Sequence, residues 1–227
     1  MINIKKIISL LIVFISSEAY AQTSKSNIGI EAGPSVISIR GNDIVKKYNE
    51  GSIGYAVNLV FQQKINKTFS LHTGIGFERK GSKFPLTATD LAGTPIGTLH
   101  GYSRWNYLTV PVLLRATFGK KGNYFVNAGP YVGYLVKQVF GNKAGVVAAG
   151  HTSNIVNDRR FDFGASLGAG LSIPVKERIA LSFEARDNLG LYNVSKVKVI
   201  NDGTIKHNTT NFLFGFMYGI NSGKKKK

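Results

Sequence analysis

Residues 106–136 constrain the fold most, because apolar and polar side chains alternate along them in two long runs. Successive strand residues point to opposite faces, so two such runs around a turn predict an antiparallel hairpin. Each run is longer than the ~9–11 tilted residues that cross a bilayer. A long strand with one fully apolar face is typical of a membrane barrel. The apolar faces are Leu108, Val110, Val112, Leu114, Ala116 and Phe118, and then Tyr124, Val126, Ala128, Val132, Tyr134 and Val136.

Six further segments alternate in the same way and predict six more strands. Their connections alternate between long and short, which is typical of bacterial outer-membrane barrels with short periplasmic turns and longer external loops. We therefore predict an all-β fold, an eight-stranded antiparallel up-and-down transmembrane β-barrel with both termini in the periplasm. The further strands are residues 28–39, 53–64, 69–80, 159–173, 179–189 and 209–220, and the long connections are residues 40–52, 81–103, 141–158 and 190–208.

A soluble barrel is the alternative to this prediction. A lipocalin-like soluble barrel also has eight strands but turns its apolar face inward around a ligand. Here the other face carries charges of both signs, which favours a polar lumen.

Pro111 and Pro130 lie inside predicted strands, where a missing N–H interrupts the ladder, so we expect a bulge or a strand edge near each.

The composition supports an all-β protein and excludes several kinds of site. Gly (26 residues), Phe (14) and Tyr (10) are abundant, and Cys is absent, so disulfides and thiolate metal sites are excluded. The net charge of +17 is compatible with nucleic acid or with an anionic lipid surface. The basic residues lie mostly in turns and loops and not in one aromatic-rich patch, which argues against nucleic acid.

The N-terminus predicts export. Lys5 and Lys6 precede a short apolar run, residues 7–15, and Ala19 and Ala21 form a small-residue cleavage site. An anchor helix would need ~20 apolar residues, so this run is too short. We predict a signal peptide at residues 1–21 and an outer-membrane barrel domain at residues 22–227.

Charged side chains on the polar face predict a filled lumen. An eight-stranded barrel is only wide enough inside for side chains, and buried charges must be paired. We therefore favour a structural, non-conducting plug over an ion path or a proton relay. The predicted lumen charge network is Glu31, Glu78, Lys80, Arg115, Arg160, Asp162, Glu184 and Arg186.

The sequence patterns that could indicate a catalytic site, a metal site or a cofactor site are all weak. Ser70, His72 and Glu78 share a face, but no nucleophile motif surrounds the serine, so a lumen histidine is the preferred interpretation. Three loop histidines give a weak metal pattern, and three glycines lack the residues of a phosphate loop. We predict no catalytic residue, no metal, no cofactor and no enzymatic activity. The residues concerned are His100, His151, His207, Gly164, Gly168 and Gly170.

Basic residues mark the short turns. Each lysine near an anionic membrane surface adds ~1 kcal/mol of attraction, so these turns could face inner-leaflet phosphates. Ordinary solvated turns are the alternative. The predicted periplasmic basic turns contain Lys64, Lys67, Lys120, Lys121, Lys176 and Arg178.

Four sequence runs resemble the outer-membrane β-barrel domain family of Bacteroidetes, often called PorT-like. They are NYLTVPVLLR at residues 106–115, GPYVGYL at 129–135, DFGASLGAGL at 162–171, and an aromatic strand at 211–218. The resemblance implies a small OmpX- or OmpA-type barrel, and one member type is linked to type IX secretion and gliding. The chain departs from the family pattern after Tyr218, where it continues to a tail of four lysines at residues 224–227.

These observations lead to one expected function and two alternatives. We expect an outer-membrane protein with a structural or interaction role that displays external loops. An accessory factor of a type IX-like secretion system and a lipid-modifying barrel enzyme are the alternatives. The expected partners are outer-membrane lipid, lipopolysaccharide, the barrel-assembly machinery and a secretion-system or surface partner, and nucleic acid is not expected.

Overall fold

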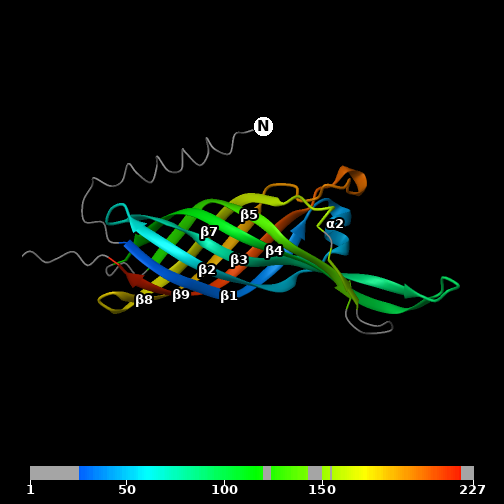
Figure 1. Cartoon of the computed structure of the whole chain (residues 1–227), viewed down its shortest axis with the longest axis horizontal. Helices are drawn as coiled ribbons and strands as arrows, with labels where there is room; N and C mark the ends of the chain where they lie inside the picture. Colours follow the sequence, from blue (N-terminus) through cyan, green and yellow to red (C-terminus); the bar gives the residue numbers. More distant parts are fainter. Residues whose placement is uncertain (1–25, 120–123, 143–149, 154, 221–227) are drawn as a thin grey trace, which may run out of the picture.

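Eight long antiparallel strands form a closed ring in the computed structural model (Figure 1). The structure describes residues 26–119, 124–142, 150–153 and 155–220. The predicted eight-stranded barrel is confirmed. The ring consists of β1 (Ser26–Arg40), β2 (Ser52–Lys64), β3 (Phe69–Thr89), β4 (Pro95–Phe118), β5 (Tyr124–Asn142), β7 (Phe161–Lys176), β8 (Ile179–Gly190) and β9 (Lys206–Gly219).

Closure joins the first strand to the last. Strands next to each other in the ring run antiparallel, and β1 pairs with β9, where Ile30 lies opposite Phe216. Closure gives the backbone N–H and C=O groups of each strand partners on both sides, which a lipid environment requires. The register places residues from distant parts of the sequence on neighbouring strands.

The predicted apolar faces point outward. Ile30, Leu59 and Phe214 are each more than half exposed, although all are large hydrophobic residues. Polar residues alternate with them and are buried, which is the reverse of a soluble protein. Aromatic residues pack on this outer surface, as in the stacked pair of Tyr55 and Phe77.

The two ends of the barrel differ in their connections. At one end, residues 65–68 and 177–178 join β2 to β3 and β7 to β8. The opposite end carries α2 (Asp43–Tyr48), the short strand β6 (Gly150–Thr152) and the 3-10 helix η2 (Ile200–Asp202). Asn42 caps α2 by accepting a hydrogen bond from Val45 N. In the part of the chain described, no helix is long and apolar enough to span a membrane.

The predicted loop at residues 81–103 is wrong, because most of it is a two-stranded ribbon. β3 continues to Thr89 and β4 begins at Pro95, with Lys83 opposite Tyr102 and Leu86 opposite Leu99. We call residues 81–104 the arm, which extends beyond the barrel and past α2 in Figure 1. Prolines and glycines are common in turns, but here a single tight turn at Asp90 is enough. The carboxylate of Asp90 accepts backbone hydrogen bonds from Ala92 at 2.9 Å and Thr94 at 2.8 Å.

Three other sequence predictions need correction or lie outside the description. The register passes unchanged through Pro111 and Pro130, so neither causes a bulge; the irregularity in this pair of strands lies between Asn106 and Tyr107. The connection predicted at residues 141–158 begins and ends two residues later, since β5 reaches Asn142 and β7 begins at Phe161; the one predicted at residues 190–208 is shorter, since β8 reaches Gly190 and β9 begins at Lys206. The predicted signal peptide and the lysine tail lie outside the described residues.

Candidate functional site

Side chains fill the barrel interior in three successive zones. From the short-turn end to the long-connection end, two polar layers are followed by an apolar cap. The lower layer consists of Glu31, His72, Arg115, Asn127, Glu184 and Arg186; the upper layer consists of Glu78, Lys80, Tyr131, Asp162, Asn188 and Asn211; the cap consists of Ile39, Val45, Trp105, Tyr107 and Leu135.

The lower layer is a charge-balanced network of two arginines and two glutamates. Arg186 Nε donates to Glu184 Oε1 at 2.6 Å, and Arg186 Nη2 donates to Glu31 Oε2 at 3.0 Å. Arg115 Nη2 donates to Glu184 Oε2 at 3.1 Å, and Asn127 donates to the other oxygen of Glu184 at 2.8 Å. These bonds connect β1, β4, β5 and β8 across the lumen. Pairing of this kind lets buried charges persist.

His72 joins the lower layer through its neighbours. It is fully buried, with Nε2 3.4 Å from Glu31 Oε1 and 3.4 Å from Arg186 Nη2. Ser70 accepts a hydrogen bond from the Gln62 amide at 3.1 Å instead of contacting His72. Ser70 and His72 therefore have separate partners within the described structure, and Glu78 belongs to the upper layer. The three residues do not form one hydrogen-bonded group.

The upper layer contains two carboxylates and one amine. Lys80 Nζ lies 2.8 Å from Asp162 Oδ2 and 3.3 Å from Glu78 Oε2. The Tyr131 hydroxyl donates to the same oxygen of Asp162 at 3.2 Å. Among the described residues, Asp162 Oδ1 is buried and has no hydrogen-bond partner. This layer therefore carries more acid than base.

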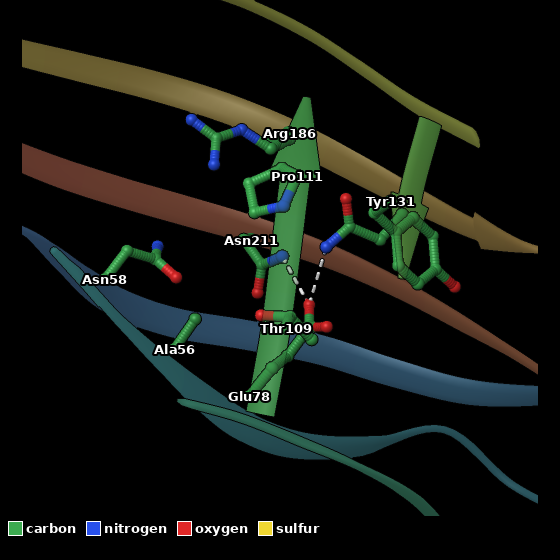
Figure 2. Close-up of a pocket in the computed structure, with 9 residues that line it drawn as sticks. Ala56, Asn58, Glu78, Thr109, Pro111, Tyr131, Arg186 and Asn211 are labelled. Atoms are coloured by element: carbon green, nitrogen blue, oxygen red, sulfur yellow. Dashed lines mark hydrogen bonds between the residues drawn. The ribbon is translucent and has the colours of Figure 1, made fainter. Parts of the chain in front are cut away.

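Two amides support Glu78 in the upper layer. Asn188 and Asn211 each donate to Glu78 Oε1 at 2.8 Å, from β8 and β9. Figure 2 shows these two bonds converging on the Glu78 carboxylate, with Arg186 of the lower layer on the far side of the pocket. The cavity between the layers has a volume of about 10 Å³, which is room for about one water molecule. The space between the two layers is therefore packed.

Aromatic residues and α2 close the lumen at the long-connection end. Trp105 and Tyr107 pack around His207, with ring centroids 5.1 Å and 5.6 Å from it. The Trp105 indole donates to Asp158 Oδ1 at 3.0 Å, so the β5–β7 connection is tied to the cap. Val45 of α2 is buried against this cluster. Burial raises the pKa of Asp158, and the Trp105 hydrogen bond and the Lys196 charge lower it in part.

Seven of the eight predicted lumen charges lie inside the barrel, and Arg160 does not. Arg160 precedes the first residue of β7 and is exposed. Its backbone oxygen accepts a hydrogen bond from Leu135 N, and its side chain turns back to donate to Leu135 O. β7 begins at Phe161, so the alternation of side chains that places Asp162 inside the barrel does not extend to Arg160. The residues that do lie inside are Glu31, Glu78, Lys80, Arg115, Asp162, Glu184 and Arg186.

The described basic turn residues gather at the short-turn end. Lys64 and Lys67 line a recess of about 250 Å³ at this mouth of the barrel. Lys176 and Arg178 line a separate surface hollow around the β7–β8 turn. Lys120 and Lys121 lie outside the described residues.

The three histidines do not form a metal site. His207 is buried in the cap, His100 lies on the arm, and His151 lies on β6. No group of three potential ligands is present within the residues that the structure describes. The glycines Gly164, Gly168 and Gly170 lie on β7, opposite β8, and added β-carbons there would meet Tyr131, Glu184 and Phe125. They make room for lumen side chains.

The sequence matches a family model, the outer membrane protein beta-barrel domain, over residues 20–196. The chain belongs to this family. Membership accounts for the apolar outer surface and the closed ring, and it makes this an outer-membrane β-barrel protein. No curated protein matches the sequence.

Solved structures with a similar arrangement are small outer-membrane barrels. Neisserial surface protein A is 10% identical, with a TM-score of 0.44 over 84% of this chain and 96% of that one. Ail, the attachment invasion locus protein of Yersinia pestis, is 10% identical, with a TM-score of 0.40 over 86% and 99%. The outer-membrane protease OmpT from Escherichia coli is 8% identical, with a TM-score of 0.43 over 86% and 97%.

Sequence reasoning missed the cap. His207 falls in a predicted loop, and Trp105 lies between a predicted loop and the following predicted strand, although both are buried in strands. The usable signal was an extension of the period-two pattern, because Ile39, Trp105 and His207 continue the inward faces of β1, β4 and β9.

Proposed function

We propose that this protein is a non-conducting outer-membrane barrel that presents the arm outside the cell for contact with another macromolecule. The single observation that carries the proposal is the contrast between a filled interior and a β-ribbon that extends well beyond it (Figure 1). A barrel that conducts solutes would need an open lumen, and a barrel that only anchors itself would need no arm.

The base of the arm packs on β5, and its tip carries exposed apolar side chains. At the base, Phe84 stacks on Phe140 of β5 with centroids 5.2 Å apart. Toward the tip, Ile96 is 46% exposed and Leu91 is fully exposed. Exposed apolar side chains on a fixed support are typical of a contact surface.

A photoreactive residue at Leu91 tests this role directly. We expect intact cells to give a defined adduct that excess unlabelled protein competes away, because the tip is presented to a specific partner. The same residue at Ile200, which is exposed on another connection, is the matched control and should give none. Absence of a competable adduct at Leu91 would overturn the proposal.

A shortened arm provides the second test. Lys83 and Tyr102 are paired, so an Asn-Gly turn can replace residues 84–101 without changing the register. We expect this variant to keep the heat-induced gel shift of a folded barrel and, when added in excess, to fail to compete with the full-length protein for the Leu91 adduct. If the partner still binds the shortened protein, the arm is not the contact surface.

The orientation is part of the proposal. The long connections face the exterior and the basic turns face the periplasm, where Lys64, Lys67, Lys176 and Arg178 lie close to inner-leaflet phosphates. Cysteines at Asp43, Gly93 and Asp202 should react with an impermeant reagent on whole cells, and a cysteine at Glu177 should not. Reaction of the cysteine at Glu177 alone would show that the barrel has the opposite orientation in the membrane.

The filled lumen has its own test. We expect the purified protein to give no stable conductance steps in planar bilayers, because two bonded layers and a cap fill the interior. Reproducible steps would contradict a non-conducting role. Membership of the PorT-like branch, an accessory role in type IX-like secretion and cleavage after Ala21 stay predictions from the sequence.

A further inference from the structure

Four cations form a patch on the outer wall where β3, β4 and β5 leave the barrel. We call Arg79, Lys83, Arg104 and Lys137 the cationic patch. The sequence neighbours of Arg79 and Arg104 are buried, so both arginines point outward. Lys137 is exposed and lies opposite Asn106, which is itself opposite Arg79.

The register brings the four side chains together although they come from three strands. Arg104 lies opposite Gly81, between the rows that hold Arg79 and Lys83. Neighbouring and diagonal positions on one sheet face have β-carbons ~4.5–8 Å apart, which long side chains span easily. One ligand group can therefore contact several of these cations at once.

The arginines are held in place without being neutralised. Arg79 donates to Asn106 Oδ1 at 3.2 Å and to the Tyr55 hydroxyl at 3.3 Å, and its guanidinium lies 4.6 Å from the Tyr55 ring centroid. The Arg104 guanidinium lies 4.2 Å from the Tyr102 ring centroid. Within the described part of the chain, none of the four cations has an ion-pair partner.

A recess of about 430 Å³ adjoins the patch. Its lining includes Lys83, His100, Tyr102 and Arg104, together with the carboxylate-bearing Glu50. Glu50 pairs with Lys83 through backbone hydrogen bonds. One carboxylate beside four cations leaves the surface positive, and Tyr102 gives the recess an aromatic wall.

The patch begins where the apolar outer rows of the barrel end. On β3, outward-facing Leu71, Ile75 and Phe77 precede Arg79, and on β5 Tyr134 and Val136 precede Lys137. These apolar rows contact lipid tails, so the first charges beyond them lie at the level of lipid headgroups. A phosphate at this height meets the two arginine forks, which suit its geometry.

We propose that the cationic patch binds the phosphorylated sugar headgroup of an outer-leaflet lipid, the lipid A class of lipopolysaccharide. The arginines and lysines contact the phosphate, and the recess beside Tyr102 takes a sugar ring. The assignment rests on the orientation proposed above, in which this end of the barrel faces the exterior. The patch includes Lys83 and Arg104 at the base of the arm, and the proposal does not depend on what the tip of the arm contacts.

Binding of bisphosphorylated lipid A to the purified, folded protein in neutral detergent with EDTA tests the proposal, with native mass spectrometry as the readout. Changing Arg79, Lys83, Arg104 and Lys137 to Gln should weaken binding at least about tenfold. The matched control changes Lys64, Lys67, Lys176 and Arg178 to Gln, which removes four cations from the other end. We expect its affinity to stay within about twofold of wild type.

A second variant guards against a folding defect. Lys83→Gln with Lys137→Gln leaves the Arg79 hydrogen bonds intact, and we expect at least about threefold weaker binding with an unchanged heat-induced gel shift. Equal affinity in the wild type and both patch variants would overturn the proposal, as would an equal loss in the control. Competition by millimolar inorganic phosphate would identify a site for free phosphate and overturn the lipid assignment.

Discussion

The two polar layers of the lumen are both buried, yet they solve the problem of buried charge differently. The lower layer balances two arginines with two glutamates, and three cationic nitrogens donate to Glu184. The upper layer sets one lysine against two carboxylates, and it relies on the neutral amides of Asn188 and Asn211. Because charge balance protects the lower layer, loss of a cation should be more damaging in the upper layer.

The largest expected effect is therefore at Lys80. Lys80→Met removes the cation that lies between Glu78 and Asp162, and it leaves two buried carboxylates facing each other. Removing one partner of a buried pair costs about 3–5 kcal/mol of unfolding free energy, and we expect the upper end of this range. The denaturant midpoint in detergent measures it. Adding Asp162→Asn should recover part of the loss, and a change below about 1 kcal/mol in Lys80→Met alone would refute the comparison.

Arg186 gives the corresponding test in the lower layer. Arg186→Ala leaves Arg115 to neutralise both Glu31, 3.9 Å away, and Glu184, 3.1 Å away. We expect a loss near the lower end of the same range, about 3 kcal/mol.

The double change Glu184→Leu with Arg186→Leu is the control for Arg186→Ala. It keeps the layer neutral, because Arg115 and Glu31 remain, and replacement of a buried pair by apolar residues is often nearly neutral. We expect the double variant to be more stable than Arg186→Ala in the same unfolding assay. A double variant that loses more than the single one would show that the layer needs the pair itself and not the balance.

The strands and their faces could be predicted from the sequence because period-two alternation is a local property. Leu108 and Val110 are apolar, and Thr109 between them is polar, so the local sequence indicates which face of the strand contacts lipid. Pairing inside the lumen is not local: Glu31 and Arg186 meet only because closure pairs β1 with β9, which pairs with β8 on its other side. Charges can be assigned to the lumen from sequence, but their partners require the register.

The errors occurred where strands end. Arg160 keeps the alternation of β7 but lies before its first residue, and nothing local marks that limit. The arm contains Pro85, Gly93, Pro95 and Gly97, which are common in turns and favour a loop there. In the structure Pro85 lies in the paired ribbon opposite His100, and Gly93 belongs to the turn at its tip. Composition alone cannot separate a loop from a two-stranded ribbon.

Two buried asparagines sharpen the comparison between the layers. Asn127 and Asn188 each donate to a glutamate at 2.8 Å. Without Asn127, Glu184 keeps donors from both arginines, but without Asn188, Glu78 keeps only Asn211 and Lys80. Hydrogen bonds to charged groups contribute about 1.5–3 kcal/mol.

We expect Asn188→Ala to lie at the upper end of this range and Asn127→Ala at or below the lower end. Unfolding in urea with the two variants side by side measures the difference. Equal losses would mean that the spare arginine donors of the lower layer give Glu184 no protection.

The smallest effect is expected at Asp158, which ties the cap to the β5–β7 connection. Burial raises the pKa of this carboxyl, so its charged form is penalised in the folded cap. The penalty applies above the folded pKa and is relieved as the pH falls through it, so the cap should become more stable on mild acidification. Asp158→Asn keeps an oxygen for the Trp105 indole and removes the charge. It should therefore be as stable as or slightly more stable than wild type at pH 7.5, by less than about 1 kcal/mol, with a flatter dependence on pH.

Trp105 is the single tryptophan of the chain, so its fluorescence reports on the cap alone. We would follow its emission during urea unfolding at pH 7.5 and at lower pH for the wild type, Asp158→Asn and Asp158→Ala. The alanine variant loses the acceptor as well as the charge, and its indole N–H is left buried without that partner, so it should be the least stable of the three. If the wild type and Asp158→Asn show the same pH dependence, the carboxyl does not titrate with the cap. In that case buried charge would affect stability in the two polar layers but not in the cap. The cap would then contribute to stability through packing and the indole hydrogen bond.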